Sequence, residues 1–140
     1  MKQTVVKTSV FGGLIALILA ALFLPEWMAE RNKEKTMAMV FTGQPVVLEF
    51  TSPGCATCAE MKPLVKKLKS DYQGKINVVV VSTESNEGRI LMKDFPVEYV
   101  PSFYIMLEKG NQYDHFEGAI PEPTFRAMLD DLLKKSDKKS

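Results

Sequence analysis

Two runs of β-branched residues on either side of a helix-like segment most strongly limit how this chain can fold. Residues 46–51 (VVLEFT) are apolar on both alternating faces except at Glu49, and residues 76–83 (INVVVVST) form a second apolar run. Strands with two apolar faces are typical of a sheet that is covered on both sides. Between the two runs, apolar side chains recur at helical spacing as far as about Tyr72. The sequence therefore predicts a right-handed βαβ unit with parallel strands.

The second half of the chain predicts a hairpin and a closing helix. A short helix is expected at residues 86–94, and two extended runs around residues 109–111 (KGN) are typical of an antiparallel hairpin. Residues 121–135 place their large apolar side chains on one helical face, which predicts the last helix. Residues 136–140 are expected to form a frayed tail. Because a chain of 140 residues suffices for one ordinary domain, everything after residue 36 must share one core.

The N-terminal region, residues 1–36, is predicted to be a membrane anchor followed by a helical spacer. Residues 8–24 contain no charge, and as a helix they would rise roughly 25 Å, near the lower limit for crossing a bilayer core. Trp27 can lie at the far interface, so the transmembrane segment is expected at about residues 8–27. A cleaved signal peptide and a buried core helix are the alternatives, but no small-x-small pair follows Leu24 where cleavage would require it.

Basic residues beside the apolar run predict its orientation. Lys7 adjoins the run directly, whereas Arg31, the first basic residue after it, lies farther from its end. Cytoplasmic flanks carry the excess of Lys and Arg close to the membrane. We therefore expect a single-pass protein of the cell membrane with a cytoplasmic N-terminus and an extracytoplasmic or periplasmic domain.

Composition excludes several classes of function. The chain has 18 basic and 17 acidic residues, and it lacks the basic stripe interleaved with aromatic residues that tracks nucleic acid. Its two cysteines are too few for a disulfide scaffold, and with the single histidine, His115, they cannot supply the four protein ligands of a structural zinc site. A redox pair, a lone structural disulfide or two idle thiols remain.

Both cysteines, Cys55 and Cys58, lie at the start of the first predicted helix, in a C-x-x-C motif. A βαβ half followed by a ββα half, with this motif at this place, resembles the thioredoxin-like proteins. Pro63 matches the proline that kinks the family's active-site helix, and Gly118 matches a glycine before its last helix. The resemblance covers residues 37–135 and implies an α/β fold, with a central mixed β-sheet flanked by helices.

The chain also departs from thioredoxins around the motif. Thioredoxins usually have Trp before the first cysteine and Gly-Pro between the pair, whereas this chain has Pro53-Gly54 before it and Ala56-Thr57 within it. Tyr99 takes the place of a small residue next to the family's cis-proline loop. The substrate and the redox poise therefore cannot be copied from thioredoxin itself.

The chemistry of disulfide exchange assigns different roles to the two cysteines. A thiolate attacks a disulfide, and the first turn of a helix stabilises that charge, so Cys55 is the expected nucleophile. Cys58, one turn later and more buried, is expected to resolve the mixed disulfide that Cys55 forms. Glu49 stands where the family carries a buried acid, which implies proton transfer with a raised pKa. A solvent-facing strand residue is the alternative for Glu49.

Residues 100–103 (VPSF) are similar to the family element whose proline is cis and lies beside the disulfide. By this resemblance Pro101 is cis and contacts the substrate, together with Tyr99, Val100 and Ser102. The alternative is an ordinary trans proline that opens a strand, because only about 5% of X-Pro bonds are cis.

The resemblance thus implies a membrane-tethered thiol-disulfide oxidoreductase that exchanges disulfides with protein substrates. It would use the Cys55–Cys58 disulfide with no bound cofactor or metal, and an upstream redox partner in the membrane. Anchored relatives often act as reductants for particular clients, such as apocytochromes, which favours the reducing direction. A non-catalytic thioredoxin-like binding module with a structural disulfide is the alternative, and metal delivery through the two thiolates is a third.

Overall fold

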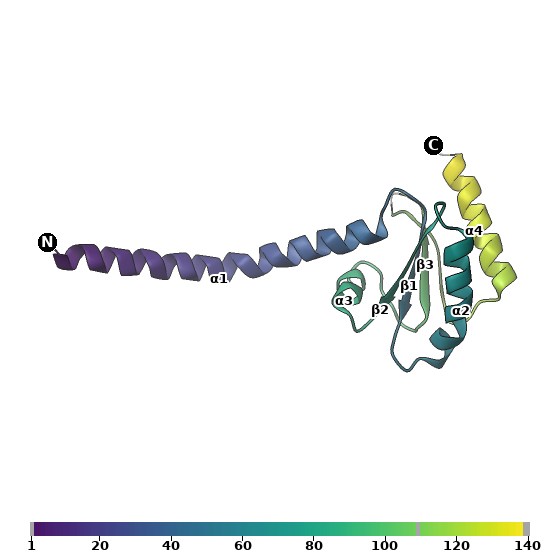
Figure 1. Cartoon of the computed structure of the whole chain (residues 1–140), viewed down its shortest axis with the longest axis horizontal. Coiled ribbons are helices and arrows are strands. Elements are labelled where there is room, and N and C mark those ends of the chain that lie inside the picture. Colours follow the sequence, from purple (N-terminus) through teal and green to yellow (C-terminus); the bar gives the residue numbers. More distant parts are fainter. Residues whose placement is uncertain (1, 109, 139–140) are drawn as a thin grey trace. The chain divides into compact units, whose positions relative to one another are not determined.

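The computed structural model describes residues 2–108 and 110–138, and Figure 1 shows its elements. In chain order they are α1 (Lys2–Val40), β1 (Val46–Thr51), α2 (Ala56–Asp71), β2 (Asn77–Ser82), α3 (Asn86–Leu91), β3 (Ser102–Met106), β4 (Gln112–Glu117) and α4 (Glu122–Asp137). The chain divides into two compact units, Met1–Lys35 and Thr36–Ser140. The last turn of α1 belongs to the second unit.

In the first unit α1 is one continuous helix, although Pro25 lies inside it. By length and composition, its segment Gly13–Val40 is the one helix among the described residues that could cross a membrane. The large apolar side chains described between Leu14 and Met28 are exposed, Leu17 most of all, with 69% of its surface accessible. The Arg31 guanidinium lies over the Trp27 ring, 4.6 Å from its centre. A helix that is apolar on all sides is normally buried in a protein core or in a membrane. This stretch is not buried in a core of the described residues.

The second unit contains a four-stranded mixed sheet with the strand order β2-β1-β3-β4. β1 pairs with β2 in parallel and with β3 in antiparallel fashion, and β3 pairs antiparallel with β4. The predicted βαβ unit, the hairpin and the thioredoxin-like fold class are thereby confirmed. Lys109, in the predicted hairpin turn, lies outside the described residues. The frayed tail predicted at residues 136–140 begins too early, because α4 continues to Asp137 and Ser136 is buried; the last two residues of that tail lie outside the described residues.

Side chains of the central strand β1 alternate between two apolar cores. Val47 packs in the core beneath α2 and α4, whereas Leu48 and Phe50 pack in the core on the opposite face, with α3 and the end of α1. Since successive residues of a strand point to opposite faces, Glu49 faces α2 on the side of Val47. This alternation brings the single carboxylate of β1 under the helix that carries the cysteines.

Helices α2 and α4 lie side by side on one face of the sheet (Figure 1) and are tied by polar contacts. Arg126 of α4 donates to both Asp71 and Glu122, and the Tyr72 hydroxyl donates to Asp130 at 2.8 Å. Beneath them the Phe125 ring meets the Phe103 ring edge-on at 5.3 Å. α2 is therefore held firmly on the sheet, which fixes the position of the cysteines at its first turn.

The short helix α3 ends at Leu91, earlier than the predicted residue 94. Turns continue the chain from there to Pro96. Ser85 caps its start by accepting the Gly88 N–H at 2.9 Å. Gly88 lies so close to β2 that an added Cβ would stand 1.9 Å from the Ser82 carbonyl oxygen. Only glycine permits that approach, so α3 is clamped to the end of β2.

Candidate active site

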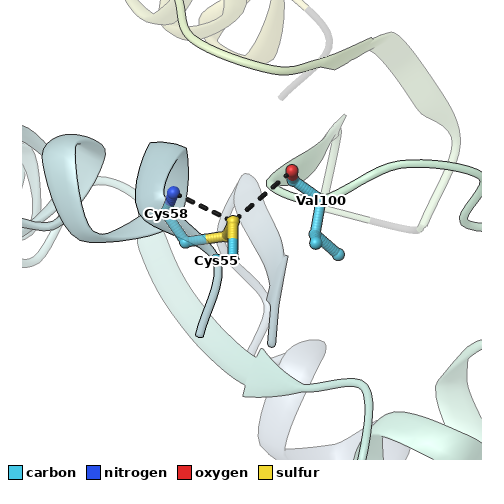
Figure 2. The surroundings of a disulfide bond; sticks show 3 residues. All are labelled: Cys55, Cys58 and Val100. Carbon is cyan, nitrogen blue, oxygen red and sulfur yellow. Dashed lines mark hydrogen bonds between the residues drawn. A yellow bond between two sulfur atoms is a disulfide. The ribbon is translucent and has the colours of Figure 1, made fainter. Parts of the chain in front are cut away.

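The two cysteines lie at the N-terminus of α2, as the motif predicted. Cys55 is the N-cap residue, with extended backbone angles, and its sulfur accepts the Cys58 N–H at 3.1 Å (Figure 2). The two sulfurs form a disulfide whose Cα atoms are 5.3 Å apart. When this disulfide is reduced, the same N–H and the positive end of the helix dipole stabilise a thiolate on Cys55.

The two sulfurs differ in their access to solvent. Cys58 is buried, with 6% of its surface exposed, whereas Cys55 is half-buried. An incoming disulfide can therefore reach Cys55 but not Cys58. The order of reaction predicted from the motif, first Cys55 and then Cys58, agrees with this difference in exposure.

The loop before β3 lies against the sulfur of Cys55. The Val100–Pro101 peptide bond is cis, which is the geometry that the resemblance implied. The carbonyl oxygen of Val100 points to the Cys55 sulfur from 3.6 Å (Figure 2). In the disulfide form this is a close contact, because only the reduced thiol has a hydrogen to donate.

Glu117 holds this loop, and sequence reasoning missed it. Its Oε1 atom accepts the backbone N–H groups of Glu98 at 3.1 Å and Tyr99 at 3.2 Å. Next to it, the Gly118 N–H donates to the Pro101 carbonyl at 2.8 Å. One acidic side chain at the end of β4 thus orders the backbone that flanks the disulfide. An acidic residue next to the expected Gly118 was visible in the sequence, but only the β3–β4 pairing brings it to this loop.

The remaining loop residues lie in two different environments. Tyr99 is exposed over 71% of its surface, so it is available to a bound protein. Ser102, which was also predicted to contact the substrate, is fully buried, and its hydroxyl lies 3.0 Å from Nε2 of His115. The His115 ring in turn stacks on Tyr104 at 4.1 Å. Ser102 begins β3 and faces inward, so its side chain does not reach the surface beside the disulfide.

Glu49 is buried, with 3% of its surface exposed, so the solvent-facing alternative is wrong. Burial raises the pKa of its carboxyl from 4.5 to about 7, because desolvation penalises the charged form. No hydrogen-bond donor within residues 2–108 and 110–138 reaches this carboxyl. A carboxyl with such a pKa can both take up and release a proton near neutrality.

A cavity of about 380 Å³ joins Glu49 to the buried cysteine. Glu49, Thr51, Cys58 and Val80 line it from the sheet and the start of α2. Three lysines of α2 line the same space: Lys62, Lys66 and Lys69. Glu49 and Cys58 therefore border one shared space beneath α2. The lysines are a second set of residues that the sequence reading did not assign to the site.

Comparison with known proteins agrees with this geometry. The thioredoxin family model matches residues 28–131, and the chain belongs to the thioredoxin family. It is 32% identical over 90 residues to thioredoxin 1 of a Nostoc species, which covers 64% of this chain and 80% of that protein. Family membership and the C-x-x-C spacing support thiol-disulfide oxidoreductase activity.

The chain is also similar to two chloroplastic plant proteins. It is 29% identical over 115 residues to the thioredoxin-like protein HCF164 of Oryza sativa subsp. japonica, across 82% of this chain and 40% of that protein. The HCF164 protein of Arabidopsis thaliana is 30% identical over 79 residues, across 56% of this chain and 30% of that protein. The chain thus spans less than half the length of these two relatives.

Proposed function

We propose that the protein is a membrane-tethered thiol-disulfide oxidoreductase that reduces disulfides in other proteins. The observation that carries this proposal is the half-exposed sulfur of Cys55 at the helix N-cap, which accepts the N–H of Cys58. This position favours a thiolate on the accessible sulfur and places the second sulfur one helical turn away. Residues 37–135 form the thioredoxin-like domain in this proposal.

The first step is attack on the substrate. The Cys55 thiolate attacks one sulfur of a substrate disulfide, and the substrate S–S bond breaks as a Cys55–substrate disulfide forms. The second substrate sulfur leaves as a thiolate and takes a proton from water. At this stage the substrate carries one free thiol, and its other sulfur is bonded to Cys55 until the second step.

The second step releases the substrate. Glu49, in its carboxylate form, accepts the Cys58 proton through the cavity, and the new Cys58 thiolate attacks the Cys55 sulfur. The mixed disulfide breaks, the substrate leaves with both sulfurs reduced, and the Cys55–Cys58 disulfide forms. That disulfide is the state of the described structure. An upstream dithiol donor must then reduce it, and no bound cofactor is needed.

The loop beside Cys55 supplies the contact with the substrate. Val100 and the cis Pro101 lie against the sulfur, where an extended substrate chain can pair with the Val100 backbone. The exposed ring of Tyr99 adds apolar contact next to that pairing. We assign substrate contact to Tyr99, Val100 and Pro101, and not to the buried Ser102.

The anchor is the N-terminal helix. Its apolar stretch could cross a membrane by length and composition, and the Lys7 and Arg31 positions favour a cytoplasmic N-terminus. The domain then lies outside the cytoplasm, and the electron donor is a membrane protein. Alkaline carbonate extraction of membranes tests the anchor, since an anchored chain stays in the pellet. An impermeant thiol reagent applied to intact cells tests the side on which Cys55 lies.

Turbidity of insulin with dithiothreitol tests the activity, with the full chain in detergent micelles. The wild-type chain is expected to accelerate insulin precipitation, and Cys58→Ser is expected to accumulate a mixed disulfide with insulin. Cys55→Ser is the matched control, because it keeps one cysteine but loses the accessible one. A chain that gives no acceleration and traps nothing in the Cys58→Ser form would be a non-catalytic binding module.

Equilibration with glutathione tests the reducing direction. A reductant has a potential below that of glutathione, and about 30 mV changes the equilibrium tenfold for this two-electron couple. Alkylation with a mass-shifting reagent separates the reduced form from the oxidised form on a gel. A potential well above that of glutathione would make the protein an oxidant while leaving its exchange activity intact.

A further inference from the structure

β2 is an edge strand whose outer side has no partner among residues 2–108 and 110–138. The Asn77 N–H donates to Pro45 and the Thr83 N–H donates to Thr51, so these residues point toward β1. Backbone groups alternate in direction along a strand. The N–H and C=O groups of Val78 and Val80 therefore point away from β1, to the open side.

This edge lacks the features that usually protect an edge strand. β2 contains no lysine and no proline, and its register with β1 has no bulge. Its two ends are occupied, since Asn77 donates its side-chain amide to Val40 at 2.8 Å and α3 clamps Ser82. Between them Val80 is 47% exposed. Natural edges are generally blunted by charge, proline or a bulge, because an open edge pairs with any added strand.

A row of positive charge lies beside the same edge. Lys62, Lys66 and Lys69 share one face of α2 and line the cavity together with Val80. No acidic side chain in the described residues pairs with them, whereas the neighbouring Lys67 bonds to Glu122 at 2.8 Å. By helix geometry, Lys62 and Lys66 lie about 6 Å apart along the axis of α2, and Lys66 and Lys69 lie about 4.5 Å apart. Alternate residues of a strand are about 6.6 Å apart, which is close to the first of these spacings and within reach of the flexible lysine side chains for the second.

We propose that the β2 edge and this lysine row bind an extended acidic segment of a partner protein by strand addition. The partner would bond to the backbone of Val78 and Val80, and its alternate side chains would lie over the cavity, on the side of Val80. Acidic residues at those positions would meet the three lysines. A second copy of this chain fits poorly, because two lysine rows would face each other across a β2–β2 contact.

The place of this edge links docking to the redox chemistry. Glu49 and Cys58 line the same cavity as the lysines and Val80. A strand added at β2 would cover the cavity mouth and limit its exchange of water with solvent. Docking would therefore act on the second step of the exchange, while leaving the Cys55 sulfur and the Val100 loop open to substrate. The docking site itself does not depend on the proposed redox activity.

A pair of synthetic, cysteine-free peptides tests the proposal against the full chain in detergent micelles. One peptide alternates glutamate with valine, and the other alternates lysine with valine. We expect the acidic peptide to bind, to weaken with added salt, and to shift the amide signals of Val78 and Val80 in NMR spectra of isotope-labelled protein. The basic peptide is expected to bind at least about tenfold more weakly.

Two kinds of variant separate backbone pairing from charge. Val80→Pro removes the outward N–H without touching the β1 ladder, and Val80→Thr is its control, because it keeps the N–H. The triple variant Lys62→Glu, Lys66→Glu, Lys69→Glu should reverse the preference to the basic peptide, whereas Lys93→Glu should change nothing. The triple variant keeps the test sharp if Val80→Pro fails to fold.

The proposal would be overturned by equal binding of both peptides or by full binding to a folded Val80→Pro variant. It would also be overturned if the acidic peptide did not shift the Val80 amide signal, or if sedimentation showed a salt-independent dimer. Chemical acetylation of the lysines, with the full chain reconstituted into nanodiscs, tests whether the lysine row binds lipid rather than a protein segment. If phosphatidylglycerol discs, but not phosphatidylcholine discs, protect Lys62, Lys66 and Lys69 in the Val80→Pro variant as well, the row binds a membrane surface instead.

Discussion

The two sides of the disulfide differ in almost every physical respect. On the Cys55 side the sulfur is half-exposed, and the neighbouring loop is held by backbone hydrogen bonds to Glu117 and Gly118. On the Cys58 side the sulfur is buried and shares a cavity with a carboxyl whose pKa is about 7. The open side suits capture of a substrate, whereas the buried side suits transfer of the Cys58 proton to a carboxyl whose pKa burial raises to near neutrality.

The largest expected effect comes from Glu49→Gln, which removes the proton acceptor but keeps the shape of the side chain. We expect release of the substrate from the mixed disulfide to slow by about a hundredfold, the lower range for a general base. Attack by Cys55 should be nearly unchanged. Quenched-flow alkylation that follows the mixed disulfide measures the two steps separately. In the wild type, release should accelerate as the pH rises through about 7, because only the carboxylate accepts the proton.

The control for this variant is Glu60→Gln, which changes an exposed glutamate of α2. If release by Glu49→Gln kept the wild-type rate and pH profile, the two sides of the disulfide would not divide the reaction in this way. Cys58 would then lose its proton to solvent or to another group.

Glu49 should also make stability depend on pH. Its pKa is higher in the folded chain, about 7 against 4.5, so the folded state binds the proton more tightly. The stabilising contribution is full below pH 4.5 and is lost as the pH rises through about 7, with a loss of about 3 kcal/mol for this buried group. Glu49→Gln should therefore be more stable than the wild type above pH 7 and equal to it below pH 4.5. Urea unfolding at both pH values checks this, and equal stability at high pH would contradict it.

Glu117→Ala probes the opposite side of the disulfide. Loss of the shared acceptor should free the backbone of Glu98 and Tyr99, raise KM for insulin roughly tenfold, and leave kcat close to the wild type, because charge-assisted hydrogen bonds contribute about 1.5–3 kcal/mol. Hydrogen exchange should show loss of protection at the two N–H groups. Glu117→Gln keeps an acceptor oxygen, so its KM should lie between those of the wild type and Glu117→Ala. A drop in kcat alone would place Glu117 in the chemistry rather than in the loop.

The smallest effect is expected from Tyr99→Ala. Because this side chain is 71% exposed, stability should change by no more than about 0.5 kcal/mol. KM for insulin should rise a few-fold, while reduction of a small disulfide such as oxidised glutathione should not change. Tyr99→Phe keeps the ring and serves as the control. An equal loss with both substrates would show that Tyr99 acts on Cys55 and not on a bound protein.

Much of the fold could be predicted because its signals are local. The apolar runs at β1 and β2 and the helical spacing after the cysteines predicted the βαβ unit. The turn residues around Gly110 predicted the hairpin. The end of α3 was misplaced by a few residues, because the segment before Pro96 makes further turn-like hydrogen bonds that no local pattern separates from helix.

The site could be predicted only in part. Cys55 and Cys58 lie next to each other along one helix, so their spacing in the sequence already implies their proximity. Ser102 was predicted to contact the substrate, but its side chain is buried, because a strand residue can face either side of a sheet and the β3–β4 pairing turns this one inward to His115. Glu117 was missed for the same reason, since its partners lie on a loop distant in the sequence.

The sequence alone determined the redox pair, its place at a helix start, the order of the elements and the presence of one long apolar helix. These depend on neighbours within a few residues, where spacing and backbone geometry are sufficient. Only the tertiary structure decided that Glu49 is buried beside Cys58, that Glu117 holds the substrate loop, and that β2 leaves an open edge beside three lysines. Burial, long-range hydrogen bonds and strand order arise when distant segments pack together. A local sequence pattern does not show which groups lose their contact with water in that packing, or which backbone groups are left without a partner.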